Sequence, residues 1–138
     1  MALLVLPGQL ERRAELYLQL AFTVGAGLPL PRALRELALK PVSRSFSAPL
    51  RRAAERLEGG DTLAEAFARQ GGWMPEFDRA MLAAGETSGR LDETLRLLAR
   101  AGRDRAASLR TMINGLIYPV AVFHVAALVF PTELLRGL

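Results

Sequence analysis

Apolar residues recur at helical spacing along most of the chain. The first run predicts a helix over about residues 9–25, because its apolar positions lie three or four residues apart. These positions are Leu10, Ala14, Tyr17, Ala21 and Val24. Between residues 16 and 24 the helix is apolar on almost every side, which is typical of a helix at the centre of a bundle or against a partner.

Two shorter helices follow. The first extends from about Pro29 to Leu39, since proline fits the first turn of a helix. The second carries an apolar stripe formed by Leu50, Ala53, Ala54 and Leu57. We expect Ser45 or Ser47 to cap this helix, Pro49 to lie in its first turn and Gly59 to follow its end.

The next two helices are marked at their ends. Thr62 and Glu65 have the spacing of a capping box, in which each side chain accepts a hydrogen bond from the other residue's main-chain N–H. This box predicts a helix over residues 63–69. Pro75 opens a further helix, which we expect to end at Gly85.

The last helix is predicted to be the longest. Ser88 is its expected N-cap, and from Leu91 an apolar seam continues in steps of three and four. The seam consists of Leu91, Leu95, Leu98, Gly102, Ala106, Leu109, Ile113 and Leu116. Because such a seam packs along a neighbouring helix, we predict an all-α chain with a bundle of about six helices.

Residues 111–132 form a run of 22 residues without a formal charge. At a rise of 1.5 Å per residue this run is about 33 Å long, enough to cross a hydrocarbon core of about 30 Å. Arginines at positions 100, 103, 105 and 110 precede it and place its N-terminal side in the cytoplasm. The alternative is a buried core helix, although so small a domain has little core to bury it.

These patterns divide the chain into three predicted parts. Residues 9–110 form a helical domain, residues 111–132 form a transmembrane helix, and residues 133–138 form a short tail.

Composition narrows the chemistry. The sequence has no cysteine and a single histidine, His124, which excludes disulfides, cysteine nucleophiles and multi-histidine metal sites. Neither a glycine-rich phosphate loop nor a nucleophile paired with a base is visible. The net charge of +4 arises from basic residues interleaved with acids, so a nucleic-acid partner is not indicated. We expect no catalytic residue and no cofactor.

One acidic segment offers a candidate cation site. Glu86 lies between Gly85 and Gly89, with Asp92 close behind, and a hard cation would need several such oxygens to converge. The spacing does not match an EF-hand loop. The alternative is that Glu86 accepts hydrogen bonds from main-chain N–H groups at the turn between the fifth and sixth helices.

The same turn resembles the signature of a known family. Gly85-Glu86-Thr87-Ser88-Gly89-Arg90-Leu91 is similar to the Gly-Glu-x-Ser-Gly-x-Leu motif of the type II secretion F domain. Other landmarks follow in family order: Gln19-Leu20, Ala26-Gly27-Leu28-Pro29-Leu30, Glu58-Gly59-Gly60-Asp61-Thr62-Leu63, Trp73-Met74-Pro75 and Tyr118-Pro119. The resemblance covers about residues 10–132.

This resemblance implies an antiparallel bundle of six helices on the cytoplasmic side of the bacterial inner membrane. It also implies a non-enzymatic platform between a hexameric cytoplasmic ATPase and the pilin-like subunits of a secretion or pilus machine. The residues that carry the family signature are Gln19, Gly27, Gly59, Leu63, Pro75, Gly85, Glu86, Ser88, Gly89, Leu91, Tyr118 and Pro119. The alternative function is a soluble helical adaptor or a nucleic-acid-binding bundle with a basic face.

The first helix also predicts self-association, which the family resemblance likewise implies. It is more apolar than one small bundle needs, so we expect its surplus face, including Leu18 and Phe22, to contact a second copy of the chain. The alternative is that the short helices surround the first helix completely.

Overall fold

The computed structural model describes residues 7–137, with the backbone alone for residues 131–135. This part of the chain forms six α-helices and one short 3₁₀ helix, and it contains no strand. The elements are α1 (Pro7–Gly25), α2 (Leu30–Leu39), α3 (Arg44–Glu58), α4 (Leu63–Ala68), η2 (Gly71–Trp73), α5 (Glu76–Ser88) and α6 (Leu91–Arg136). The prediction of an all-α chain with a long last helix is therefore confirmed.

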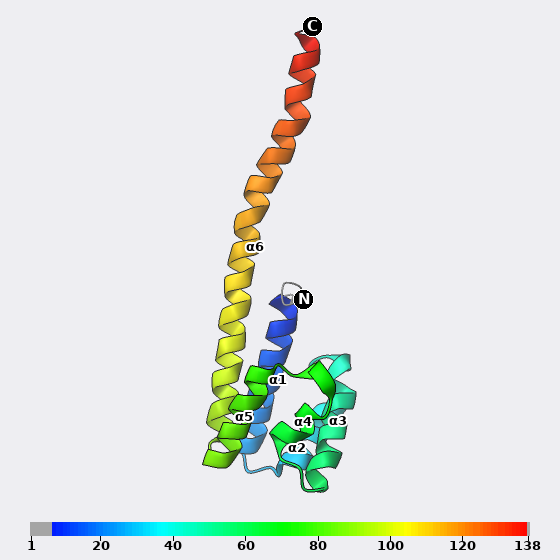
Figure 1. Cartoon of the computed structure of the whole chain (residues 1–138), viewed down its shortest axis with the longest axis vertical. Helices are drawn as coiled ribbons and strands as arrows, with labels where there is room; N and C mark the ends of the chain where they lie inside the picture. Colours follow the sequence, from blue (N-terminus) through cyan, green and yellow to red (C-terminus); the bar gives the residue numbers. More distant parts are fainter. Residues whose placement is uncertain (1–6, 138) are drawn as a thin grey trace.

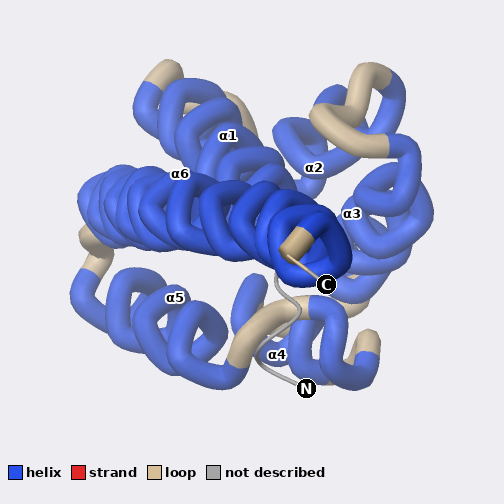
Figure 2. Tube along the Cα trace, turned by 90° about the horizontal axis from the view of Figure 1, so that it is seen from above, coloured by secondary structure: helices blue, strands red, loops and turns tan. Residues whose placement is uncertain are grey.

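The helices are arranged around an antiparallel pair, α1 and α6, which makes the most extensive helix contact in the bundle (Figure 1). Seen from above, α6 lies between α1 and α5 (Figure 2). The helices α2 and α3 form a hairpin, α3 contacts α4, and α4 contacts α5. The chain thus passes around the bundle before α6 returns along α1.

A single apolar core lies inside this ring of helices. Its large, fully buried side chains include Leu16, Leu20, Leu34, Leu50, Leu63, Phe67, Leu82 and Leu95, so every α-helix contributes to it. Burial of side chains of this size contributes about 1.5–3 kcal/mol each relative to exposure. The half-buried Trp73 packs on the core, with its ring centroid 5.6 Å from that of Phe46 and 5.2 Å from that of Phe67.

The helix α6 has 46 residues and lies in two environments. Its first half is held in the bundle by Leu95, Leu98, Ala99 and Ala106, which are at most 4% exposed. Every side chain from residue 111 to residue 130 is exposed, and this half projects beyond the bundle (Figure 1). Among the described residues, α6 is the one helix whose length and composition would allow it to cross a membrane, and its most apolar window is not buried in the bundle.

The start of α3 differs from the prediction. This helix begins at Arg44, before the caps predicted at Ser45 or Ser47, and Pro49 lies in its interior rather than its first turn. Phe46 and Pro49 are both buried, so packing against the core holds the first turns of α3 in place. The Ser47 hydroxyl instead donates to a main-chain oxygen of α2 at 2.8 Å and joins the two helices of the hairpin.

Candidate functional site

The signature turn connects α5 to α6, and its geometry corrects the predicted helix ends. The helix α5 does not end at Gly85 but continues to Ser88, and Gly89 follows with a φ of 71°. The Arg90 N–H donates to the Gly85 carbonyl at 2.8 Å, and the Gly89 N–H donates to the Glu86 carbonyl at 3.3 Å. This is a left-handed helix ending, which glycine adopts without steric cost.

Ser88 is consequently the last residue of α5 and not the N-cap of α6. Its hydroxyl donates back to the Gly85 carbonyl at 3.3 Å. At the start of α6, the Arg90 carbonyl accepts from the Thr94 N–H at 3.0 Å. Leu91 then begins α6 and packs, half-buried, against the core. The prediction was wrong because Gly89, and not Gly85, supplies the positive φ that ends α5.

Gly85 has a packing role inside α5. A Cβ atom at this position would lie 2.5 Å from Oγ1 and 2.9 Å from Cβ of Thr94 on α6. Such distances are far below van der Waals contact, so any larger residue would force the helices apart or displace Thr94. The first glycine of the motif therefore sets how closely α5 approaches α6.

Glu86 joins the signature turn to the middle of the chain. Its carboxylate accepts from the N–H groups of Leu63 at 2.8 Å and Ala64 at 2.9 Å, the first two residues of α4. Glu86 thus accepts hydrogen bonds from main-chain N–H groups, as the alternative interpretation predicted. These groups belong to α4, however, and not to the turn between α5 and α6. A carboxylate at a helix N-terminus satisfies free donors and interacts favourably with the helix dipole.

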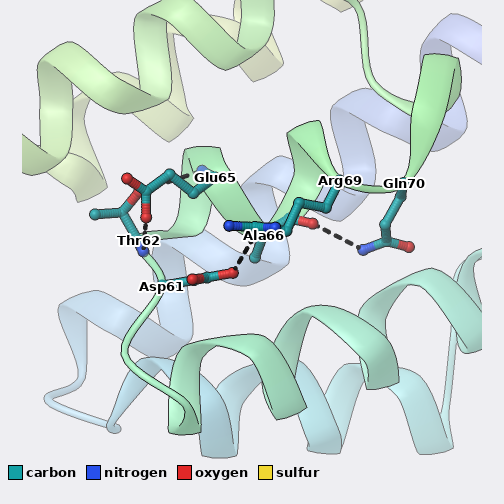
Figure 3. A network of polar contacts seen from close by, with 6 residues as sticks. All are labelled: Asp61, Thr62, Glu65, Ala66, Arg69 and Gln70. Atoms are coloured by element: carbon teal, nitrogen blue, oxygen red, sulfur yellow. Dashed lines mark hydrogen bonds and ion pairs between the residues drawn. The ribbon is translucent and has the colours of Figure 1, made fainter.

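The short helix α4 depends on these contacts. It has six residues, far fewer than an isolated helix needs in water. Figure 3 shows the predicted capping box: the Thr62 hydroxyl accepts from the Glu65 N–H at 3.2 Å, and the Glu65 carboxylate accepts from the Thr62 N–H at 3.0 Å. Together with Glu86, the box gives each N–H of residues 62–65 a partner. Two segments of the family signature therefore stabilise one helix.

The candidate cation ligands Glu86 and Asp92 border one open cleft, which no other described acidic residue lines. Both carboxylate oxygens of Glu86 already accept main-chain hydrogen bonds. Asp92 lies in the first turn of α6, where an acid interacts favourably with the helix dipole. Among the side chains of residues 7–130, no group of three or more histidine or acidic residues is placed to hold a metal ion.

A cleft of about 570 Å³ opens between α3 and α4, and its lining contains three arginines and two acids. Its lining includes Arg52 and Arg56 from α3 and Arg69 from the end of α4. The Arg69 Nε lies 3.1 Å from the Asp61 carboxylate, and the Gln70 amide donates to a main-chain oxygen of α3 at 2.9 Å. Figure 3 shows Asp61, Arg69 and Gln70 together on this side of α4. These contacts hold α4 against α3 while leaving two arginines exposed.

The α1–α6 pair is close because its facing residues are small. A Cβ atom at Gly102 of α6 would lie 3.1 Å from the Cβ of Ala14 on α1. Two ion pairs flank this contact, Glu15 with Arg103 at 3.2 Å and Glu11 with Arg110 at 2.8 Å. The pairs are partly exposed and contribute at most about 1 kcal/mol each, so packing of the small residues dominates the contact.

A buried polar pair, which sequence reasoning missed, links α1 to α5. The Tyr17 hydroxyl donates to the Asp78 carboxylate, and these residues are 3% and 8% exposed. Burial and, secondarily, the negative charge of Asp78 raise the pKa of Tyr17 well above its ordinary value, against an opposing contribution from Arg13. A tyrosine at a predicted core position signals that a buried partner exists, but nothing in the local pattern identifies Asp78.

The remaining signature residues of the bundle lie mostly at helix ends. Gly27 has a φ of 87° after α1, Gly59 caps the end of α3, and Pro75 immediately precedes α5. Leu63 is fully buried at the start of α4, and Gln19 is half-buried within α1. The signature therefore fixes helix ends and helix contacts in this bundle.

Tyr118 and Pro119 lie in the exposed half of α6. The helix continues through Pro119 without ending, and Tyr118 is 76% exposed. The sole histidine, His124, has its Nδ1 atom 3.0 Å from the carbonyl oxygen of Val120, one turn earlier. These residues belong to the segment that the sequence predicts to enter a membrane.

The two residues predicted to mediate self-association differ in exposure. Phe22 is 57% exposed, and the Arg96 guanidinium lies 5.2 Å from its ring centroid. Leu18 is half-buried and packs against the core. The bundle therefore leaves Phe22 uncovered and covers Leu18 in part.

The family model for type II secretion system (T2SS) protein F matches residues 16–135, from α1 through the exposed half of α6. This chain belongs to that family. The resemblance inferred from the signature turn is thereby confirmed.

Three relatives illustrate the range of the F family. Type II secretion system protein F of Xanthomonas campestris pv. campestris is 37% identical over 110 residues, which are 78% of this chain and 26% of that protein. Protein transport protein HofC homolog of Escherichia coli strain K12 is 31% identical over 119 residues, 86% of this chain and 30% of that protein. Type IV pilus assembly protein PilC of Myxococcus xanthus is 34% identical over 119 residues, 86% of this chain and 28% of that protein.

The F-family chain spans 26–30% of the length of these relatives. Two of the relatives are named for type II secretion and type IV pilus assembly, and one is named for protein transport. These names and the family match support a role for this chain as a component of secretion or pilus assembly machinery.

Proposed function

We propose that this chain is a membrane-anchored scaffold of a type II secretion or type IV pilus assembly machine. The bundle of residues 9–110 lies in the cytoplasm, residues 111–132 cross the inner membrane, and residues 133–138 form a tail on the far side. The observation that carries this proposal is the continuity of α6, which passes without a break from the bundle core into an exposed apolar half. The arginines that precede residue 111 support a cytoplasmic bundle.

The scaffold role is non-enzymatic. The signature residues of the described bundle make turns, helix caps and close helix contacts, as at Gly85, Glu86 and Gly89. A scaffold needs this kind of precision, because it must hold its binding surfaces in a fixed relation to the membrane.

The absence of cysteine from the sequence allows a direct test of the orientation. Ser45→Cys places a thiol at an exposed position near the start of α3, and Gly137→Cys places one beyond α6. In intact spheroplasts, a membrane-impermeant maleimide is expected to label Gly137→Cys but to label Ser45→Cys only after lysis. Equal labelling of both variants before lysis would contradict the proposal, as would recovery of the chain in the soluble fraction.

The cytoplasmic ATPase is proposed to contact the α2–α3 hairpin. Residues 30–58 carry seven basic and three acidic side chains, a surplus of four that equals the net charge of +4 of the whole chain. Figure 1 shows α3 on the side of the bundle opposite α6, and the cleft beside α3 presents Arg52 and Arg56. An acidic surface on the ATPase would complement this hairpin. Pilin-like subunits would contact the exposed half of α6 within the membrane.

Reversal of charge at the hairpin tests the ATPase contact. Arg52→Glu combined with Arg56→Glu is expected to abolish co-purification of the full chain with the ATPase of the same machine. The matched control is Arg12→Glu combined with Arg100→Glu, which makes the same charge change at exposed positions on α1 and α6. Equal loss of binding in both variants would indicate a non-specific charge effect and refute the assignment.

Self-association through Phe22 is part of the same proposal. Because Phe22 is exposed and Leu18 packs on the core, the two changes to glutamate have different expected results. Phe22→Glu is expected to reduce the oligomer mass in light scattering of the detergent-solubilised chain while the bundle stays folded. Leu18→Glu is expected to lower the melting temperature as well. A wild-type chain that is monomeric at all accessible concentrations would refute self-association.

A further inference from the structure

We propose that the membrane-facing end of the bundle holds the headgroup of an anionic phospholipid, an inference that rests on the membrane anchoring proposed above. The binding site is a groove of about 720 Å³ between the start of α1, the loop from η2 to α5 and residues 104–109 of α6. Figure 1 shows these segments at the end of the bundle from which α6 projects. Residue 109 lies only two positions before the apolar half of α6.

Two arginines on different helices line the groove. The Arg13 guanidinium on α1 lies 5.1 Å from the Trp73 ring centroid, and its Nη2 atom donates to the Trp73 carbonyl at 2.7 Å. The Arg105 guanidinium on α6 lies 5.9 Å from the ring centroid of Phe77. The aromatic contacts orient both cations without neutralising them.

The charges in the groove favour an anion. Among the described residues neither Arg13 nor Arg105 forms an ion pair, whereas Arg103 and Arg110 of the same helix are paired with carboxylates of α1. Of the residues that line the groove, Asp104 is the one acid, so the lining carries a net charge of +1. A phosphodiester would complete the charge balance.

The walls of the groove identify a lipid rather than a soluble anion. Leu10, Trp73, Pro75 and Leu109 provide an apolar lining beside the arginines. Leu109 shares a face of α6 with Met112 and Leu116, three and seven residues further on, which are 66% and 64% exposed. The groove therefore leads into an apolar stripe. A phospholipid has the matching arrangement, with an anionic phosphate at the membrane surface and acyl chains directed into the hydrocarbon.

Trp73 is the only tryptophan of the chain and allows occupancy of the groove to be measured. The full chain is placed in phosphatidylcholine nanodiscs with a fixed share of phosphatidylglycerol. Bromine is carried on the acyl chains of either lipid, next to the ester groups, at equal total bromine. Bromine quenches tryptophan fluorescence at contact. The groove predicts stronger quenching of Trp73 when the phosphatidylglycerol carries the bromine.

Two arginine variants separate the groove from general charge attraction. Arg105→Gln is expected to weaken the apparent affinity for phosphatidylglycerol about fivefold, equivalent to about 1 kcal/mol for one arginine near the membrane surface. Arg12→Gln is the control, because this change removes the same charge as Arg105→Gln. Arg12 is exposed near the start of α1, next to Arg13, but it does not line the groove. Loss of general charge attraction affects both variants alike. Arg12→Gln is therefore expected to weaken the affinity less than Arg105→Gln does.

Three results would overturn the proposal. The first is equal quenching by both brominated lipids in nanodiscs that contain the chain, which would refute the groove but leave membrane anchoring intact. The second is an equal effect of Arg12→Gln and Arg105→Gln. The third is a change of Trp73 emission on addition of inorganic phosphate to the detergent-solubilised chain, which would identify a site for a free anion. Failure of the chain to enter nanodiscs would refute the anchoring itself and the groove with it.

Discussion

The two halves of α6 share one helix but differ in what surrounds them. In the first half, Leu95, Leu98 and Ala106 are buried and Gly102 lies against Ala14. In the second half every described side chain up to residue 130 is exposed, although the residues are more apolar. The first half is thus stabilised by contacts within the bundle, whereas the described part of the chain provides no apolar surrounding for the second.

Because of this contrast, the stability of the bundle and the membrane insertion of the chain can be altered separately. Changes in the first half are expected to alter the stability of the bundle without altering where the chain resides. Changes in the second half are expected to alter membrane insertion without altering the fold. Because Trp73 is the only tryptophan and packs on the core, its fluorescence reports unfolding of the bundle alone.

The largest expected effect is on insertion. Val122→Arg places a charge near the centre of the exposed apolar run, at a cost of about 2.5–3.5 kcal/mol in the insertion equilibrium. The fraction of the chain in isolated membranes is expected to fall, while the melting temperature of the bundle in detergent stays unchanged. The control, Leu97→Arg, adds the same charge at an exposed position of the first half and should leave the membrane fraction as it was.

A pair of glycine substitutions compares the bundle with the exposed half directly. Gly85→Val forces a side chain into the contact with Thr94 and is expected to destabilise the bundle by about 2–3 kcal/mol. Gly115→Val meets open space and is expected to leave the stability of the bundle unchanged. Urea titration of Trp73 fluorescence measures both. Equal stabilities would show that the α5–α6 contact yields easily to an added side chain.

The buried pair Tyr17 and Asp78 gives the bundle a specific alkaline sensitivity. Tyr17→Phe leaves the Asp78 carboxylate without its donor and is expected to cost about 2 kcal/mol at neutral pH. Since the pKa of Tyr17 is raised on folding, its contribution is complete below the ordinary tyrosine pKa of about 10 and is lost as the pH rises above it.

Urea titrations on both sides of this pH check the assignment. The wild-type bundle should lose stability above it, and Tyr17→Phe should lose less over the same interval. Tyr118→Phe, in the exposed half of α6, should behave as the wild type. An identical alkaline loss in wild type and Tyr17→Phe would exclude Tyr17 as the cause.

The smallest of these effects is expected at the junction that leads into α6. Gly89→Val places a β-branched residue at a φ of 71°, at a cost of about 1–2 kcal/mol in bundle stability. Gly89→Asn should cost less, because asparagine tolerates the left-handed conformation better. The difference between the melting temperatures of the two variants measures this conformational preference. If both variants melt together with the wild type, the left-handed ending contributes little.

Much of the fold was predictable because helical periodicity and glycine positions are local signals. The capping box is an example, since Thr62 and Glu65 are only three positions apart and this spacing alone defines its geometry. The errors arose where two local signals competed. Gly85 and Gly89 both resemble helix ends, and only the close approach of Thr94 explains why Gly85 lies inside a helix. At α3, buried Phe46 and Pro49 outweighed the preference of serine for a cap.

Sequence reasoning pointed to the signature turn but not to the contacts that its residues make. The signature turn identified Glu86 as a residue of interest, yet its partners Leu63 and Ala64 lie 23 and 22 residues away on another helix. Tyr17 and Asp78 are 61 residues apart, and the groove beside Arg13 and Arg105 requires three separate segments to meet. Contacts of this kind depend on the tertiary arrangement, which no local pattern specifies.

The unbroken course of α6 also has a mechanical consequence. A continuous helix without a loop at the bundle boundary behaves as a stiff rod, so a torque applied to the bundle is transmitted along it. The part of α6 from residue 111 to residue 136 is about 39 Å long, and a tilt of about 10° would displace its far end by about 7 Å. Bending is easiest near Pro119, where the helix lacks one main-chain hydrogen bond. In the proposed membrane-spanning arrangement, the bending stiffness of α6, and not only its contacts, would determine how much of a movement of the bundle reaches the far end of the helix.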